Sequence, residues 1–154
     1  MILEDRLHET IVAVGSVMAD AHEPWWIISG AAAAIYGAHP ITVSDVDVLV
    51  SAGDALRIFP RLGIERAAPS DHPRFRSEIF GQWTKSALIV EFMANFKLCE
   101  PDGVWRLVRP TTRRQMTVGD TMVYVPELLE LRDMFRKFGR AKDRVRIELL
   151  NQLR

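Results

Sequence analysis

The sequence predicts a mixed α/β (α+β) fold, in which helices pack on a mixed β-sheet and the chain ends in a helical pair. Two observations predict it. Short apolar, β-branched runs alternate with segments whose apolar residues recur every three or four positions, and residues 126–153 read as helix throughout. The chain has 154 residues, of which 48% are hydrophobic and 26% charged, so we expect one globular domain over residues 1–154.

The first third of the chain predicts two helices around one strand. Apolar residues at helical spacing predict a helix over residues 3–20, and Pro24 interrupts the segment that follows. The run WWIIS (25–29) is short and apolar, which indicates a buried strand. The alanine-rich residues 30–37 have the composition of a tightly packed helix, with Gly37 as its C-terminal cap.

The middle of the chain reads mainly as strands. The β-branched run DVDVLVS (45–51) predicts a strand, and a short helix should follow and end near Pro60. Residues 74–83 and 86–96 predict a pair of strands joined by a turn. Together with the first strand and the strands expected further along the chain, these segments should form one sheet on which the helices pack.

The last third predicts further strands and then the helical pair. The turn signal PDG (101–103) precedes an apolar run, and two more short strands should flank the sequence VGD (118–120). Pro126 suits the first turn of a helix, and Gly139 suits a break between two helices. The C-terminal helices are therefore expected over about 126–153.

Composition excludes several classes of protein. Twenty acidic and twenty basic residues give no net charge, which argues against a partner held mainly through a broad basic face. A single cysteine excludes an internal disulfide and a cysteine-rich zinc site, and favours a reducing compartment. The first residues lack the pattern of a signal peptide, and no run reaches the roughly 20 apolar residues that cross a membrane. We therefore expect a cytoplasmic protein with no membrane partner.

Two carboxylates stand at the head of the second predicted strand, at Asp45 and Asp47. Side chains alternate along a strand, so these two share one face while Val46 and Val48 point into the core. Charges about 4 Å apart repel by about 4 kcal/mol at an effective dielectric constant of 20, a cost that a divalent cation would offset. A bare D-x-D is equally common among solvated surface carboxylates, so both interpretations stay open.

A third carboxylate, Glu91, lies inside an apolar strand between Val90 and Phe92. Burying it without a partner would be costly. If this strand lies beside the first, Glu91 joins Asp45 and Asp47, and three carboxylates can hold one or two Mg²⁺ ions, with Mn²⁺ as the alternative ion. The competing interpretation is a glutamate that faces solvent.

The junction Ser29-Gly30 lies where the first strand turns into a helix. A helix N-terminus exposes unpaired N–H groups that suit a phosphate. Gly30 lets a ligand approach the backbone closely, and the hydroxyl of Ser29 can donate to a phosphate oxygen. A plain strand–helix turn with a small-residue packing face is the alternative.

Taken together, residues 25–51 resemble the core of the nucleotidyltransferase superfamily, which has the DNA-polymerase-β-like fold. The resemblance is strongest to small bacterial nucleotidyltransferase-like proteins related to abortive-infection toxins. That pattern consists, in this order, of an apolar strand, a small residue pair, a helix ending in glycine, and Asp-x-Asp on the next strand. The matching residues here are Ser29, Gly30, Ala32, Gly37, Asp45 and Asp47, with Glu91 at the third acidic position and Pro126, Arg140, Lys142 and Asp143 in a similar tail.

The resemblance implies a Mg²⁺-dependent enzyme that transfers a nucleoside monophosphate from a nucleoside triphosphate, such as ATP, to a hydroxyl acceptor. Asp45 and Asp47 would hold two Mg²⁺ ions. Glu91 would complete one metal site and orient or deprotonate the attacking hydroxyl.

The resemblance also implies nucleotide-binding residues. Ser29 and Gly30 would bind the β- and γ-phosphates. Arg140 and Lys142, on or near the C-terminal helices, would reach the triphosphate, although a solvated basic helix face is an equal alternative.

The acceptor and the biological role stay open. RNA and protein are candidate acceptors, and the protein could be the toxin of a toxin–antitoxin pair with an antitoxin partner. Ile41 and Val43 stand where many relatives carry Arg and Thr, and the small pair is Ser-Gly rather than Gly-Gly or Gly-Ser. These departures keep an alternative in view, namely a non-catalytic module on the same fold that binds a nucleotide or a partner.

Overall fold

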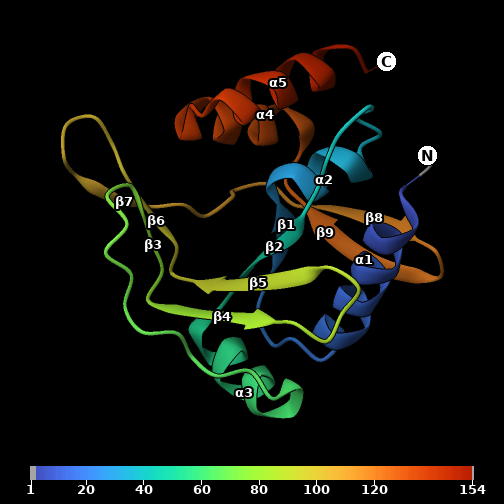
Figure 1. Cartoon of the computed structure of the whole chain (residues 1–154), viewed down its shortest axis with the longest axis vertical. Coiled ribbons are helices and arrows are strands. Elements are labelled where there is room, and N and C mark those ends of the chain that lie inside the picture. Colours follow the sequence, from blue (N-terminus) through green and yellow to red (C-terminus); the bar gives the residue numbers. More distant parts are fainter. Residues whose placement is uncertain (1–2, 154) are drawn as a thin grey trace.

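The computed structural model describes residues 3–153, so residues 1, 2 and 154 at the ends of the expected domain lie outside the described part. Its centre is a four-stranded sheet with the order β1-β2-β5-β4 (Figure 1). β2 and β5 run parallel, whereas the two outer pairings are antiparallel, so the sheet is mixed as predicted. The four strands are β1 (Trp26–Ile28), β2 (Asp45–Val50), β5 (Ile89–Ala94) and β4 (Ile79–Trp83).

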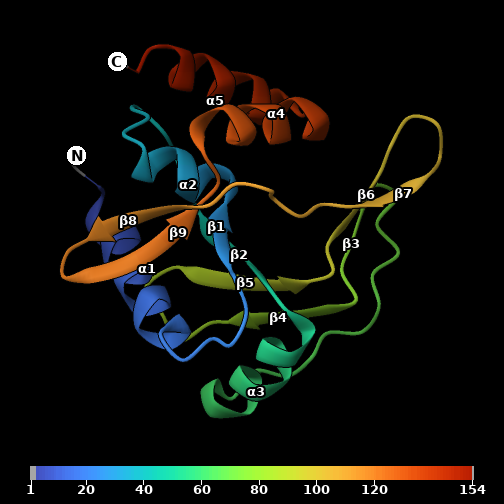
Figure 2. The ribbon, with the colours of Figure 1, turned by 180° about the vertical axis from the view of Figure 1, so that it is seen from behind.

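One face of the central sheet forms the main hydrophobic core. Helices α1 (Asp5–Met18) and α3 (Ala52–Leu62) cover this face (Figure 2). Val46 and Val48 of β2 are fully buried against them, as the alternation along the strand predicted. Asp45 and Asp47 lie on the other face of β2 and therefore do not belong to this core.

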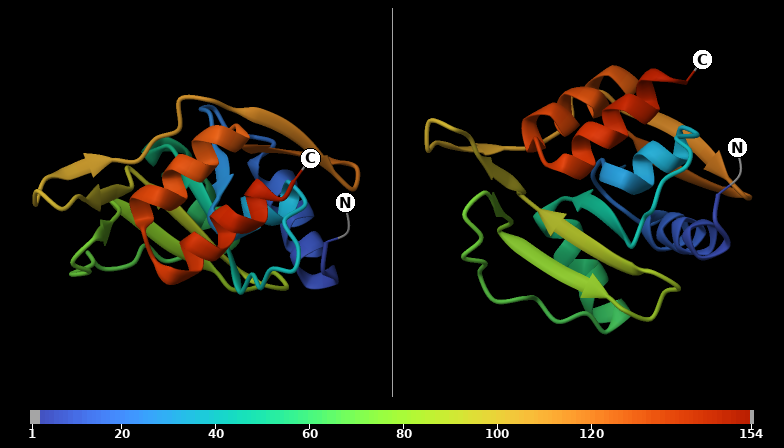
Figure 3. Two further views of the ribbon diagram at one scale, coloured as in Figure 1. Left: turned by 90° about the horizontal axis from the view of Figure 1, so that it is seen from above. Right: turned by 45° about the horizontal axis from the view of Figure 1, so that its top comes forward.

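The opposite face carries a second apolar cluster at one end and carboxylates at the other. Residues of α4 (Leu128–Phe138) complete this cluster, and α5 (Ala141–Asn151) packs beside α4 as the predicted helical pair (Figure 3). The short helix α2 (Ser29–Ile35) lies between the central sheet and the pair. The cluster consists of Trp26, Ile28, Leu49, Met93, Phe96, Leu98, Met134 and Phe138.

The prediction of a single sheet was wrong, because the described residues form three. The predicted strand 74–83 is divided: β3 (Phe75–Arg76) pairs with β6 (Lys97–Cys99), whereas β4 pairs with β5. Asn95 has a left-handed φ of 50°, which redirects the chain between β5 and β6. The other strands are β7 (Trp105–Leu107), which pairs with β6, and the separate hairpin of β8 (Arg114–Val118) and β9 (Thr121–Val125).

The end of α3 also differs from the prediction. Pro60 lies inside the helix, which continues to Leu62 and ends at Gly63 with φ 66°. Proline has a helical φ but lacks the N–H that would donate to the carbonyl four residues earlier, and the helix ends two residues after Pro60. Among residues 3–153, no helix combines the length and the apolar character that crossing a membrane requires.

Candidate active site

Strand register gathers the three predicted carboxylates. Asp47 lies opposite Glu91 in the parallel pairing of β2 with β5, and Asp45 precedes it on the same face. One ligand oxygen from each of Asp45, Asp47 and Glu91 lies within 4.8 Å of the others. We call this group the acidic triad.

The acidic triad concentrates negative charge in a partly buried position. Burial, the charges of Asp45 and Glu91, and a hydrogen bond with Glu91 raise the pKa of Asp47 to about 8, while Lys142 acts in the opposite direction. Glu91 is also oriented by Gln82, whose amide donates to its Oε2 at 3.1 Å. Three hard oxygen donors with such mutual repulsion fit a divalent cation such as Mg²⁺ or Mn²⁺.

The turn from β1 into α2 brings Ser29 and Gly30 beside the acidic triad. Ser29 has φ 60°, and its hydroxyl accepts a hydrogen bond from Arg146 Nη1 at 3.2 Å. A methyl group on Gly30 would lie 2.6 Å from Arg146 Nη2, so the guanidinium lies directly on this glycine. Because α2 has only seven residues, the guanidinium is the stronger source of positive charge at this turn.

Arg146 was not among the residues predicted for the site. It lies on α5 four residues after Lys142, and this spacing places both side chains on one face of the helix. The Arg146 side chain is 12% exposed, and Asp143 Oδ1 lies 3.9 Å from its Nη1. Burial lowers the pKa of Arg146, whereas Asp143, Asp47 and Asp45 act to raise it. Helical spacing from Lys142 was the sequence signal that could have found it.

The two predicted cations of the tail take different positions. Arg140 donates from Nε and Nη2 to the fully buried Asp143, at 2.6 and 3.0 Å, and Asp143 also accepts from the backbone N–H of Arg140 at the start of α5. Its guanidinium also lies over the rings of Phe75 and Phe138, at 5.3 and 5.5 Å. Lys142 is exposed and close enough to Asp47 to lower that carboxyl's pKa. Arg140 therefore has a structural role at the rim of the site, while the charge of Lys142 acts on Asp47.

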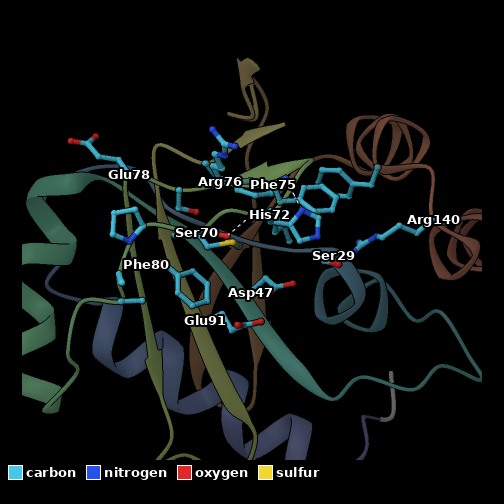
Figure 4. Close-up of a pocket in the computed structure, with 18 residues that line it drawn as sticks. Ser29, Asp47, Ser70, His72, Phe75, Arg76, Glu78, Phe80, Glu91 and Arg140 are labelled. Atoms are coloured by element: carbon cyan, nitrogen blue, oxygen red, sulfur yellow. Dashed lines mark hydrogen bonds between the residues drawn. The ribbon is translucent and has the colours of Figure 1, made fainter. Parts of the chain in front are cut away.

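A pocket opens beside the acidic triad, over β4 and β5 (Figure 4). Asp47 and Glu91 line it together with Ser29, Arg140 and other polar side chains and with a set of apolar ones. We call it the aromatic pocket after the rings of this apolar set. Phe75 lies 5.9 Å from Phe96 and 5.7 Å from Phe138, measured between ring centres. The apolar set is Ile28, Phe75, Phe80, Met93, Phe96 and Phe138.

The segment between α3 and β3 forms one wall of the aromatic pocket and is fixed at both ends. The backbone N–H of Ala67 donates to the carbonyl of Phe80 at 2.8 Å. At the other end, Arg74 donates to the carbonyls of Phe138 and Lys137 at the end of α4, at 2.7 and 3.2 Å. The pocket could not be predicted from the sequence, because its walls come from segments far apart in the chain.

No family model and no curated protein matches the sequence. Solved structures do match. A candidate nucleotidyltransferase (TM1012) from Thermotoga maritima aligns with a TM-score of 0.76 and 16% identity, over 99% of this chain and 97% of that one.

Two antibiotic-modifying proteins also match. The lincosamide antibiotic adenylyltransferase LnuA, solved with lincomycin, gives a TM-score of 0.63 at 9% identity over 99% of both chains. The antibiotic-resistance factor ANT(2'')-Ia gives 0.64 at 11% identity, over 96% of this chain and 84% of that one. At such low identity the likeness establishes the fold, and the chain therefore has the fold of the nucleotidyltransferases, as the resemblance of residues 25–51 predicted.

Proposed function

We propose that this protein is a metal-dependent nucleotidyltransferase that moves a nucleoside monophosphate from a nucleoside triphosphate to a hydroxyl acceptor. The observation that supports it most is the acidic triad beside the Ser29-Gly30 turn, on a nucleotidyltransferase fold. LnuA is an adenylyltransferase, and ANT(2'')-Ia has been solved with adenylyl-2''-tobramycin, which supports ATP as the donor.

The acidic triad would perform the chemistry. Asp45 and Asp47 would hold two Mg²⁺ ions, or Mn²⁺ in their place, and Glu91 would complete one of these sites. Such ions, when bound, neutralise triphosphate charge and steady the attacking and leaving oxygens. Glu91, oriented by Gln82, would accept the proton of the acceptor hydroxyl. The bond from that oxygen to the α-phosphorus forms as the bond to pyrophosphate breaks.

The β1–α2 turn would bind the departing pyrophosphate. Arg146 offers a planar fork of N–H donors directly over Gly30, a geometry that suits phosphate oxygens. Ser29 adds a hydroxyl, and Lys142 adds a mobile charge on the same helix face as Arg146. Arg140 would contribute from the rim, where Asp143 holds it. The contribution of these residues is positioning and charge stabilisation.

A second candidate is a non-catalytic module that binds a nucleotide or a protein partner. Ile41 and Val43 before β2 favour it, because apolar side chains stand there in place of the Arg and Thr of many relatives. A toxin role with an antitoxin partner, and RNA or protein as the acceptor, stay predictions from the resemblance. We also propose that residues 1–154 form one domain, since the main hydrophobic core joins Leu7 of α1 to Leu150 of α5.

Label transfer tests the enzyme. The full chain is incubated with each α-labelled nucleoside triphosphate, Mg²⁺ or Mn²⁺, and total RNA or lysate, beside the variant Asp45→Asn/Asp47→Asn. We expect the wild type to transfer label and the double variant to lose it. A matched control is Asp20→Asn, because this carboxylate is 75% exposed and lies outside the pocket of the triad. Equal labelling by wild type and double variant, or none with any donor, would contradict the proposal.

A further inference from the structure

The pocket beside the acidic triad differs in chemistry between its two ends. On the β1 side, Ser29 and Gly30 lie under the guanidinium of Arg146. Ser29 and Arg140 line the aromatic pocket on this side, whereas on the β4 side Phe80 and Met93 face each other across β4 and β5. Figure 4 shows Ser29 and Arg140 on one side of the carboxylates and Phe80 on the other.

Nucleotidyl transfer needs both sides, because the attacking and leaving oxygens lie roughly in line through the phosphorus. If the departing pyrophosphate lies at Ser29-Gly30, the acceptor approaches over β5 and β4, where Glu91 is placed to take its proton. The aromatic pocket opens at that position. This step rests on the proposed function.

We infer that the aromatic pocket binds the acceptor, and that the acceptor is a small, uncharged, ring-bearing molecule with a free hydroxyl group. Its oxygen would attack the α-phosphorus, its proton would pass to Glu91, and pyrophosphate would leave toward Ser29. The apolar body would lie against Phe75, Phe80 and Met93, which accounts for rings beside a hydrophilic catalytic centre.

Charge at the rim of the aromatic pocket supports an uncharged acceptor. Arg76 lies 4.3 Å from the ring centre of Trp105, and Arg140 is held by Asp143. Glu78 accepts a hydrogen bond from the amide of Asn95. The rim charges therefore have mixed signs and intramolecular partners. An RNA strand would need a row of cations free to bind phosphate, and a polycation would need an acidic wall beyond the acidic triad.

The fixed wall supports a small acceptor. The loop of residues 67–74 is held to β4 through Ala67 and to α4 through Arg74. His72 stiffens it further, because its Nδ1 accepts from the backbone N–H groups of Arg74 and Phe75 at 3.0 and 3.1 Å. This loop thus bounds the aromatic pocket on the side away from the acidic triad.

Binding is tested with two neutral probes that differ only in a ring. The full chain, with Mg²⁺ and a non-hydrolysable ATP analogue, is titrated with phenyl β-D-glucoside and with methyl β-D-glucoside. Burial of the phenyl group should make the first bind about tenfold tighter or more. Phe80→Ser, and Phe75→Ser as a second variant, should abolish the preference. Leu56→Ser should retain it, because Leu56 is 57% exposed on α3 outside the pocket.

Three binding results would overturn the inference. The first is equal affinity for the two probes, and the second is a preference for the phenyl probe that survives both phenylalanine variants. The third is displacement of the phenyl probe by the ATP analogue, because this would assign the pocket to the nucleoside. Simultaneous binding of probe and analogue supports the acceptor site.

A transfer assay separates this inference from the proposed function. With labelled ATP, we expect phenyl β-D-glucoside to accept label at least about tenfold faster than methyl β-D-glucoside, tobramycin or total RNA. Preferred labelling of tobramycin or RNA would overturn the inference and leave the proposed function standing. Probe binding beside the ATP analogue, with no label transferred from any nucleoside triphosphate to any acceptor, would overturn the proposed function and the acceptor role together.

Discussion

Asp47 and Glu91 lie opposite each other in the parallel register of β2 and β5. Adjacent strands are about 4.8 Å apart, so the backbone itself sets the separation of the two carboxylates. Both side chains lie on the face of the sheet that also carries Asp45, so neither carboxylate can move far from the other two. Repulsion within the acidic triad is therefore built into the strand pairing, and a cation relieves it.

A divalent cation should stabilise the folded chain. We expect Mg²⁺ or Mn²⁺ to raise the free energy of unfolding, by about 2.7 kcal/mol at a free concentration a hundredfold above Kd. Thermal unfolding with either ion, compared with chelator alone, measures the effect. Asp47→Asn should abolish most of the shift, whereas Asp20→Asn should leave it intact. A shift of equal size in both variants would mean that the ion binds elsewhere.

Glu91 should matter more for the chemical step than for nucleotide binding. Glu91→Gln keeps the hydrogen-bonding shape but removes the base, so kcat should fall about 100-fold or more, while the affinity for the triphosphate changes little. Glu91→Asp, which shortens the side chain but keeps the carboxylate, should retain more activity than Glu91→Gln. Steady-state kinetics and titration with a non-hydrolysable triphosphate separate the two quantities. Unchanged kcat in Glu91→Gln would remove Glu91 from the role of base.

Gly30 and Arg146 should act as one unit in triphosphate binding. A methyl group on Gly30 would lie 2.6 Å from Arg146 Nη2 and 2.9 Å from Cζ, so Gly30→Ala must displace the guanidinium. Gly30→Ala and Arg146→Ala should each weaken triphosphate binding by about tenfold or more.

The double variant tests that coupling. Gly30→Ala/Arg146→Ala should bind the triphosphate no more weakly than Arg146→Ala alone, because both changes remove the same contact. Isothermal titration gives the affinities. The control is Arg144→Ala, since Arg144 is exposed on the same helix and donates to the carbonyl of Gly139. Additive losses in the double variant would mean that the two residues act separately.

Local patterns were enough to predict the residues of the acidic triad. Alternation along a strand places Asp45 and Asp47 on one face, and a carboxylate inside an apolar strand singles out Glu91. Each signal depends only on the residues of its own short segment. The pairing of β2 with β5 then brings the two segments together in register. The helical pair was equally visible, because Pro126 and Gly139 are local signals of its boundaries.

Features built from distant segments could not be predicted in this way. Residues 74–83 form two strands that pair with different partners, β3 with β6 and β4 with β5, and Asn95 turns the chain between those partners. The aromatic pocket likewise needs Phe75, Phe80 and Phe138 from three elements. Arg146 lies 117 residues from Ser29 along the chain, so only the packing of α5 against α2 shows their contact.

Asp54 should stabilise the fold in a pH-dependent way. It is 1% exposed and accepts hydrogen bonds from the backbone of His22 and Glu23, at 2.9 and 3.0 Å, and from Arg57 at 2.6 Å. Burial opposes its ionisation, but these hydrogen bonds outweigh burial and lower its pKa. Asp54→Asn should therefore lower the free energy of unfolding at pH 7 by about 1–3 kcal/mol, because the amide satisfies fewer donors.

The pH dependence distinguishes the charge of Asp54 from its shape. A carboxyl whose pKa is lower in the folded chain stabilises that chain fully above the unfolded value of about 3.9, and this contribution is lost as the pH falls through the folded value. The difference between wild type and Asp54→Asn, measured by urea denaturation, should shrink as the pH falls through this range. Asp71→Asn, at an exposed loop position, should change stability by no more than about 0.5 kcal/mol at pH 7. A difference for Asp54→Asn that stays constant down to acid pH would mean that the loss comes from packing, with the carboxylate charge contributing nothing.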